Sequence, residues 1–350
     1  SIVPHREAPG CSAVASHSHF QQTPIQYFAY FFSCVRNPSN FPDKLVESSG
    51  GFFYSLFSKI PRSFPDNKLS VPLLNINIPA PWGLSSGWAD SYEKLIQIRK
   101  IGAGIVISKT ITINPLKGNP YPRIVRDKKN KWLINSMGLP NQGLKKWLSW
   151  LSSYENLPNG IFLSIKGHSI KEWDLLIKKL SPFTSLLELN LSCPNVKDGI
   201  MDMDKTVILI NRIAKKFPKV NFSIKISSEY HINQILRLLD NIHGVKNNIK
   251  GLSLFNTYPV VHNRLGIKNK QGGLSGPILF PKLTRFLKEI RQEYNFNKLL
   301  LFATGGIENG EQAINIWQNY QAFPLCLTAF LTQGPFIFNN WAKVFSNRKI

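Results

Sequence analysis

The sequence has few cysteines and few acidic residues. Only 4 of its 350 residues are Cys, and no C-x-x-C pair occurs. Neither a disulfide framework nor a Cys-based zinc site is therefore indicated, and a reducing compartment is favoured. Asp and Glu total 20 against 43 Lys and Arg, which gives a formal net charge of +23. Because the basic residues are scattered, we interpret them as a biased surface that can attract an anionic substrate or acidic lipid, and we expect no nucleic-acid partner.

Long apolar runs are also missing. No stretch approaches the ~18–20 apolar residues that span a bilayer. Residues 1–24 show neither a basic start nor an apolar core typical of a secretory signal. We therefore expect a cytoplasmic protein. Its hydrophobic content of 43% is enough for a large core and excludes a disordered or collagen-like chain.

Residues 1–70 differ from the rest of the chain. A Ser-, His- and Pro-rich tail precedes aromatic runs at residues 27–32 and 52–57. We expect a partly disordered extension that contains two short amphipathic helices. These helices would pack on the main domain or, through residues 26–60, bind a partner or a membrane surface.

From residue 71 to residue 350, apolar β-branched segments alternate with helical patterns. Continuous apolar strands separated by helices predict a parallel sheet covered on both faces. Eight such units in about 280 residues are typical of a (β/α)8 TIM barrel. A doubly wound open sheet is the alternative, but no G-x-G-x-x-G follows the first strand. The expected strands are 81–84, 104–107, 161–165, 186–191, 221–226, 251–255, 299–302 and 324–327. The expected helices are 90–99, 144–152, 170–180, 206–216, 232–239, 281–291, 310–318 and 336–344.

Polar residues lie at or directly after the ends of the expected strands, where barrel enzymes carry their chemistry. Lys109 directly follows an apolar strand and Lys225 lies among apolar neighbours, and a desolvated ammonium needs an anionic partner. Cys193 lies between a strand and a proline. Its flanking residues Asn190 and Asn195 make this loop cysteine a candidate base or nucleophile.

Two glycine-rich segments, residues 271–276 and 303–308, are expected to form loops. Exposed backbone N–H groups in such loops bind anions, and barrels commonly hold a phosphate after strands seven and eight.

The scarcity of carboxylates excludes a two-acid glycosidase and a metal hydrolase, and we expect no metal. Further asparagines, Asn135 and Asn256, add donors and acceptors that suit a planar, amide-rich, anionic substrate beside a phosphate-bearing cofactor.

Six segments, taken in order, resemble the dihydroorotate dehydrogenase family. They are Ser-Lys-Thr-Ile-Thr at 108–112, Gly-Asn-Pro-Tyr-Pro-Arg at 118–123, Ile-Asn-Ser-Met-Gly-Leu-Pro-Asn at 134–141, Asn-Leu-Ser-Cys-Pro-Asn at 190–195, Gly-Gly-Leu-Ser-Gly at 272–276 and Thr-Gly-Gly-Ile at 304–307. The resemblance runs from about residue 71 to the end. It implies an FMN-binding (β/α)8 barrel that oxidises dihydroorotate to orotate in pyrimidine (UMP) biosynthesis.

The resemblance also implies roles for individual residues. Cys193 matches the base that takes a proton from C5 of dihydroorotate while C6 passes a hydride to the flavin. A cysteine there marks the class 1 enzymes, where class 2 has serine. Lys109 matches a catalytic lysine that touches flavin and substrate, and Lys225 matches a lysine near the flavin N1–C2 edge. The other implied substrate contacts are Asn135, Met137, Gly138, Leu139, Asn190, Asn195, Asn256 and Thr257. The other implied flavin contacts are Ser85, Ser86, Gly87, Thr110, Asn190, Gly273, Gly276, Gly305, Gly306 and Thr328.

The chain departs from the family at two places. Residues 84–87 read Leu-Ser-Ser-Gly where Asn-Ala-Ser-Gly is frequent, and Leu327-Thr328 replaces a Gly-Thr pair that offers N–H groups to the phosphate. The electron acceptor stays open between fumarate, a quinone and NAD reached through a partner, as do a homodimer and a peripheral membrane contact. The alternatives are a related FMN barrel acting on another dihydropyrimidine, or a barrel without turnover that serves as a binding protein.

Overall fold

The computed structural model describes residues 69–127, 129–153, 157–191, 203–243, 248–293 and 299–348. The expected N-terminal helices, Cys193 and Asn195 lie outside these residues. Eight parallel strands close into a barrel, which confirms the expected (β/α)8 fold. In their order around the barrel they are β3 (Gly83–Leu84), β4 (Ile105–Ile107), β7 (Ile161–Ile165), β8 (Leu187–Asn190), β9 (Phe222–Lys225), β10 (Ile249–Leu254), β13 (Leu300–Thr304) and β14 (Phe323–Cys326).

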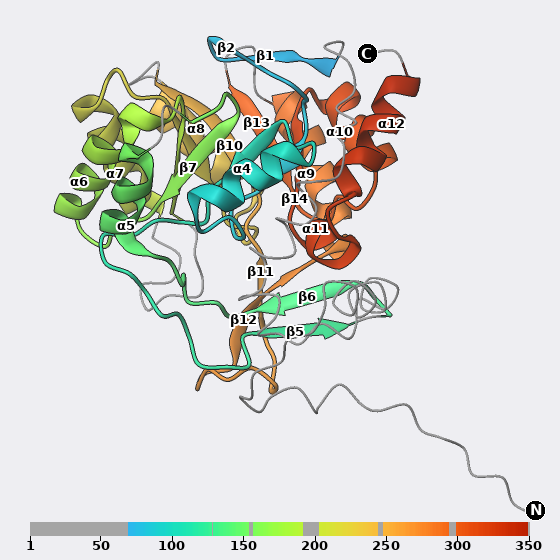
Figure 1. Ribbon diagram of the computed structural model, residues 1–350, viewed down its shortest axis with the longest axis horizontal. Coiled ribbons are helices and arrows are strands. Elements are labelled where there is room, and N and C mark those ends of the chain that lie inside the picture. The colour runs from blue at the N-terminus through green and yellow to red at the C-terminus, as the bar shows by residue number, and fades with distance from the viewer. Residues whose placement is uncertain are drawn as a thin grey trace, which may run out of the picture.

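Helices surround the barrel (Figure 1). They are α4 (Tyr92–Lys100), α5 (Gly143–Ser152), α6 (Ile170–Leu180), α7 (Met203–Lys216), α8 (Ile232–His243), α9 (Phe280–Glu293), α10 (Gly310–Tyr320), α11 (Thr328–Gln333) and α12 (Ile337–Asn347). The short helix α11 was not expected. The starts of three helices are fixed by N-cap side chains, since Ser91, Ser169 and Asn309 each accept a hydrogen bond from a backbone N–H of the first turn.

The N-terminal end of the barrel interior is apolar. The ring of Phe302 on β13 lies 6.2 Å from that of Phe162 and 5.7 Å from that of Phe323, measured between centroids. The hairpin formed by β1 (Val71–Leu73) and β2 (Ile76–Ile78) packs on this cluster. It therefore closes this end of the barrel (Figure 1).

A second sheet lies at the opposite end (Figure 1). It is antiparallel in the order β11 (Tyr258–Val261), β12 (Gln271–Ser275), β6 (Trp132–Asn135), β5 (Ile124–Asp127). Two long loops, after β4 and after β10, supply one hairpin each. The expectation of a glycine-rich loop at residues 271–276 is wrong, because residues 271–275 form β12. Glycine is disfavoured in strands, so the sequence suggested a loop.

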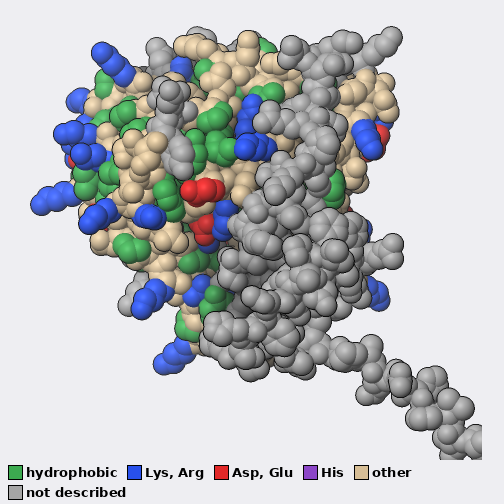
Figure 2. Space-filling model, viewed as in Figure 1, with side chains coloured by type: hydrophobic (Ala, Val, Ile, Leu, Met, Phe, Trp, Pro, Cys, Tyr) green, Lys and Arg blue, Asp and Glu red, His purple; other side chains and the backbone are tan. Residues whose placement is uncertain are grey.

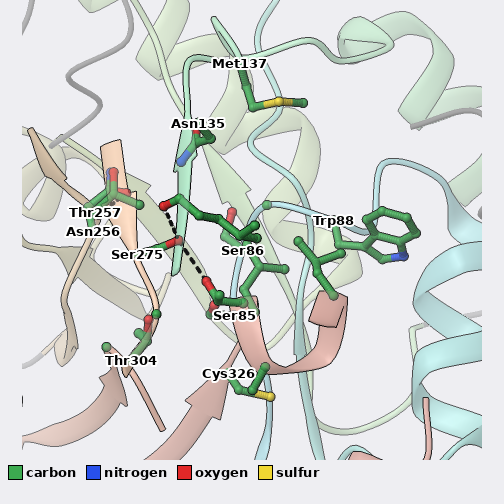
Figure 3. Close-up of a pocket in the computed structure, with 18 of the residues that line it drawn as sticks. Ser85, Ser86, Trp88, Asn135, Met137, Asn256, Thr257, Ser275, Thr304 and Cys326 are labelled. Atoms are coloured by element: carbon green, nitrogen blue, oxygen red, sulfur yellow. Dashed lines mark hydrogen bonds between the residues drawn. The ribbon is translucent and has the colours of Figure 1, made fainter. Parts of the chain in front are cut away.

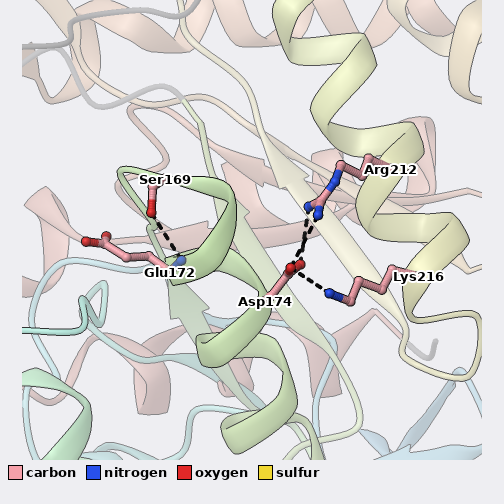
Figure 4. Close-up of polar contacts among 5 residues, drawn as sticks. All are labelled: Ser169, Glu172, Asp174, Arg212 and Lys216. Atoms are coloured by element: carbon pink, nitrogen blue, oxygen red, sulfur yellow. Dashed lines mark hydrogen bonds and ion pairs between the residues drawn. The ribbon is translucent and has the colours of Figure 1, made fainter.

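Surface contacts join neighbouring helices. Asp174 on α6 contacts two residues of α7, Arg212 at 3.3 Å and Lys216 at 2.6 Å (Figure 4). Burial raises the pKa of Asp174, but hydrogen bonds from Lys216 and Arg212 outweigh it and hold the pKa below its ordinary value.

Lysine and arginine side chains are spread over the visible face, with few acidic ones between them (Figure 2). This distribution agrees with the excess of basic residues in the composition. Among the described residues, no helix combines the length and the apolar character that crossing a membrane requires.

Candidate active site

A cavity of about 290 Å³ lies between the carboxyl ends of the barrel strands and the antiparallel sheet. Most of the residues singled out from the sequence line it. They are Ser85, Ser86, Gly87, Lys109, Thr110, Asn135, Met137, Leu139, Asn190, Lys225, Asn256, Thr257, Gly276, Gly305, Gly306 and Thr328. Gly138 and Gly273 are described but do not line the cavity. Cys193 and Asn195 are not among the described residues.

Asn190 and Lys225 form the floor of the cavity. They are the last residues of β8 and β9, and they are register partners. Both are buried, at 4% and 6% exposure. The Nδ2 of Asn190 donates a hydrogen bond of 2.8 Å to Oγ1 of Thr110, whereas its Oδ1 is buried without a partner. An unpaired buried acceptor is costly, so this oxygen points to a ligand that donates a hydrogen bond.

The antiparallel sheet and the segments beside it supply a second set of amide groups. Asn135 ends β6, and its Nδ2 donates to the carbonyl of Gly273 at 3.2 Å. Asn256 follows β10, and its Oδ1 accepts from the backbone N–H of Thr257 at 2.9 Å. The Oγ1 of Thr257 is buried without a partner. These three residues lie at one side of the cavity, with Trp88 at the other (Figure 3).

A glycine cradle follows β13. Gly306 has a φ of +76°, and a Cβ there would lie 2.6 Å from the carbonyl oxygen of Gly276 and 2.7 Å from the backbone nitrogen of Phe280. Only glycine fits this position. Thr328, at the start of α11, donates from Oγ1 to Ser275 Oγ at 2.8 Å or accepts from it, so the antiparallel sheet is tied to the end of β14.

The cavity also contains a cysteine that the sequence analysis did not consider. Cys326 ends β14 and lines the cavity, and burial raises the pKa of its thiol well above the ordinary range. The thiol is therefore protonated near neutral pH and is a poor candidate for a base. Among the described residues, no cluster of His, Cys, Asp and Glu could hold a metal ion.

Further lining residues carried no motif that would have revealed them. Trp88 packs edge-on against Phe330, with ring centroids 6.2 Å apart. Lys94 pairs with Asp90 at 2.7 Å and lies 5.2 Å over the Trp88 ring. All but Phe330 line the cavity. In the sequence, Trp88, Asp90 and Lys94 were marked as possible site residues only by their closeness to Gly87, which follows the first barrel strand. Leu327 also lines the cavity, and its Cδ2 would lie 2.6 Å from a Cβ placed on Gly87.

The closed parallel barrel and the polar cavity at its carboxyl end define a (β/α)8-barrel enzyme. The model of a family described as "Dihydroorotate dehydrogenase" matches residues 68–346. The chain therefore belongs to the dihydroorotate dehydrogenase family, as its motifs indicated.

Two relatives share the name "Dihydroorotate dehydrogenase B (NAD(+)), catalytic subunit". That of Lachnoclostridium phytofermentans is 28% identical over 258 residues, which are 70% of this chain and 82% of the relative. That of Thermotoga maritima is 29% identical over 254 residues, covering 70% and 86%. The structure of DHODH from Eimeria tenella in complex with ferulenol has a TM-score of 0.76 at 22% identity, covering 89% of this chain and 93% of that one. At this identity the structural likeness shows the fold.

Members of this family depend on a flavin in general. The cavity fits such a group in three respects. The glycine cradle excludes any Cβ at Gly306, the Oδ1 of Asn190 and the Oγ1 of Thr257 are buried without hydrogen-bond partners, and the buried Lys225 lines the cavity with its positive charge. A flavin has an amide-rich ring and, in its nucleotide forms, an anionic phosphate, and these are groups that such residues bind.

Proposed function

We propose that the flavin of this chain is FMN and that Cys193 is the base of the reaction. The reaction itself, the oxidation of dihydroorotate to orotate in pyrimidine biosynthesis, follows from the family to which the chain belongs. The observation that carries the proposal is the gathering of Asn135, Asn190 and Asn256 with Lys109 and Lys225 around one cavity. These residues come from five separate segments of the chain.

The amide groups bind and orient the substrate. Orotate and dihydroorotate present ring N–H and C=O groups and a carboxylate, and asparagine pairs with all of these because it carries both a donor and an acceptor. The free acceptor on Asn190 suits a ring N–H. The ammonium groups of Lys109 and Lys225, which both line the cavity, compensate negative charge on the bound groups.

Proton removal from C5 is assigned to Cys193. The residue stands three positions after Asn190, where β8 has brought the chain to the cavity. A flavin held in this cavity would supply the acceptor for the hydride that leaves C6 as the C5–C6 double bond forms. Cys326, the cysteine that lines the described cavity, is held in the thiol form by burial, and the family's motif at residues 190–195 implies Cys193 as the base.

The FMN phosphate is placed at the loops after β13 and β14. Gly305 and Gly306 line the cavity there with positive φ values, a backbone arrangement that suits phosphate binding, and Thr328 offers a further N–H at the start of α11. Leu327, in place of the family's glycine, keeps its own N–H. Its side chain packs toward Gly87 at the cavity wall.

We propose NAD⁺, reached through a second protein, as the electron acceptor. The relatives' names give NAD(+) for those proteins and call them catalytic subunits, which supports a separate electron-transferring partner. Contact with a membrane through residues 26–60 and a homodimer stay predictions.

The test begins with the flavin released from the purified protein, which chromatography separates into FMN and FAD. We expect FMN, and its absorbance should bleach under anaerobic conditions when dihydroorotate is added but not with dihydrouracil, which lacks the carboxylate. Reoxidation is then tried with fumarate, a soluble quinone and NAD⁺ in turn. A protein without flavin, or one that dihydrouracil reduces as fast, would contradict the proposal. Rapid reoxidation by fumarate or quinone alone would contradict the proposed acceptor.

A further inference from the structure

A polar layer crosses the barrel interior beneath the cavity. It consists of the register partners Ser164 on β7, Glu188 on β8 and Ser223 on β9, and Ser253 on β10, the register partner of Lys225, adjoins it; each is at most 1% exposed. The Oγ of Ser253 donates to Oε2 of Glu188 at 2.7 Å. Because β9 lies between β8 and β10, this hydrogen bond runs through the inside of the barrel.

Glu188 is the only Asp or Glu buried among the described residues. Its Oε1 is buried without a hydrogen-bond partner, and so is the hydroxyl of Ser223, its register partner. A half-satisfied buried carboxyl group costs stability, and an apolar side chain would avoid that cost. The residues two positions before Ser164 and Glu188, Phe162 and Leu186, are apolar and belong to the core cluster under the β1–β2 hairpin. Packing of the barrel interior therefore does not explain a carboxyl group at this position.

Lys225 lies one layer above Glu188. It follows Ser223 by two positions on β9, as Asn190 follows Glu188 on β8, so the two layers are about 7 Å apart. Within the described part of the chain, neither Glu188 nor Lys225 makes an ion pair. The other buried lysine, Lys166, follows Ser164 by the same two positions, but it does not line the cavity. Of the two buried lysines above Glu188, Lys225 is thus the one that faces the cavity, and in an interior of low dielectric the charge of Glu188 opposes its charge.

We propose that Glu188 sets the reduction potential of the bound flavin by opposing Lys225. Reduction adds negative charge to the flavin ring. The ammonium of Lys225 at the cavity floor favours this charge, and the carboxylate one layer below disfavours it. The balance keeps the flavin reducible by dihydroorotate yet still able to pass its electrons on. The redox part of this inference rests on the proposed function, whereas the charge balance does not need the flavin.

The test compares Glu188→Gln, Lys225→Met and the double variant with the parent. The potential of the bound flavin should rise in Glu188→Gln, with the reduction equilibrium favoured on the order of tenfold, or about 30 mV for two electrons. The potential should fall in Lys225→Met. In the double variant the reduction equilibrium should return to within about threefold of the parent's. Glu229→Gln, an exposed carboxylate just after β9, removes the same charge outside the barrel and should leave the potential unchanged.

A second readout uses the apoprotein. Each single variant leaves one buried charge uncompensated, so each should lower the unfolding temperature, and the double variant should lose less than the sum of the two. A reduction equilibrium of the flavin in Glu188→Gln that stays within twofold of the parent's would overturn the inference. Strictly additive losses of stability in the double variant would overturn it as well. A parent protein that binds no flavin would instead overturn the proposed function. The unfolding temperatures of the apoprotein variants would then be the test of the charge balance.

Discussion

The two ends of the barrel interior are built from the same strands but from opposite kinds of side chain. On β13, Phe302 faces the apolar cluster under the β1–β2 hairpin, whereas Thr304, two positions later, lines the cavity. From Leu186, just before β8, the chain passes through Glu188 to Asn190 in the same way. Positions two apart on a strand share a face, so each strand supplies packing at one end and polar groups at the other. Stability and chemistry are thereby separated along the barrel axis.

This comparison predicts that a change at the carboxyl end will remove the cofactor without unfolding the protein. Gly306→Val places a β-branched side chain at a φ of +76°, against the carbonyl of Gly276. We expect complete loss of flavin absorbance from a protein that still folds by circular dichroism. Gly334→Val is the matched control, since Gly334 has a φ of +86° but no atom within 4 Å of its Cβ position. Full flavin content in Gly306→Val would show that the cradle is not part of the site.

A change at the apolar end should have the reverse effect. Phe302→Ala opens a cavity among Phe162, Phe323 and Leu186, and the free energy of unfolding should fall by about 3–5 kcal/mol. The folded fraction should keep its flavin and its rate of reduction by dihydroorotate. Phe336→Ala, at a position 42% exposed, should cost much less. Denaturant titration gives the stability, and equal losses in the two variants would contradict the packing described here.

The smallest expected effect lies outside the barrel, on the helices. Asp174→Asn removes the contacts with Arg212 and Lys216, so the free energy of unfolding should fall by about 1 kcal/mol at neutral pH. The pKa of Asp174 is lowered by folding, so its stabilising effect is complete above the unfolded value of about 3.9 and is lost as the pH falls through the folded value.

The difference between parent and variant should therefore shrink below about pH 4. Asp240→Asn, an exposed carboxylate on α8, is the control and should show almost no difference at any pH. If the difference in the free energy of unfolding between the parent and Asp174→Asn stays constant down to pH 2, the charge of Asp174 is not the source of its stabilising effect.

The barrel was predictable because each of its strands is a local apolar segment flanked by breakers. The helix at residues 170–180 and the strand at 161–165 were placed with their observed ends. The antiparallel sheet was not predictable in this way, since β12 pairs with β6 across 138 residues between Asn135 and Gly273. Glycine is required in β12 because neighbouring side chains leave no room for a Cβ. A Cβ on Gly273 would lie 1.9 Å from Oγ1 of Thr257.

Most of the cavity lining could be read from residues at the strand ends, because parallel strands converge there. The polar layer beneath it was missed, although the alternation in Leu187-Glu188-Leu189-Asn190 carried the signal. Period-two alternation inside a barrel strand means that one face is polar, and here that face is the interior. Trp88 and Lys94 could not have been found, since their place in the cavity depends on how α4 packs.

The central claim, that the segment leaving β8 provides the base, is tested most directly by stopped-flow reduction of the flavin in Cys193→Ala. A positioned base contributes roughly 10²–10⁴-fold, so anaerobic bleaching by dihydroorotate near neutral pH should slow by about that factor. FMN content and orotate binding should be unchanged, and Cys193→Ser should recover part of the rate at higher pH. A rate for Cys193→Ala within about threefold of the parent would place the base elsewhere and contradict the account.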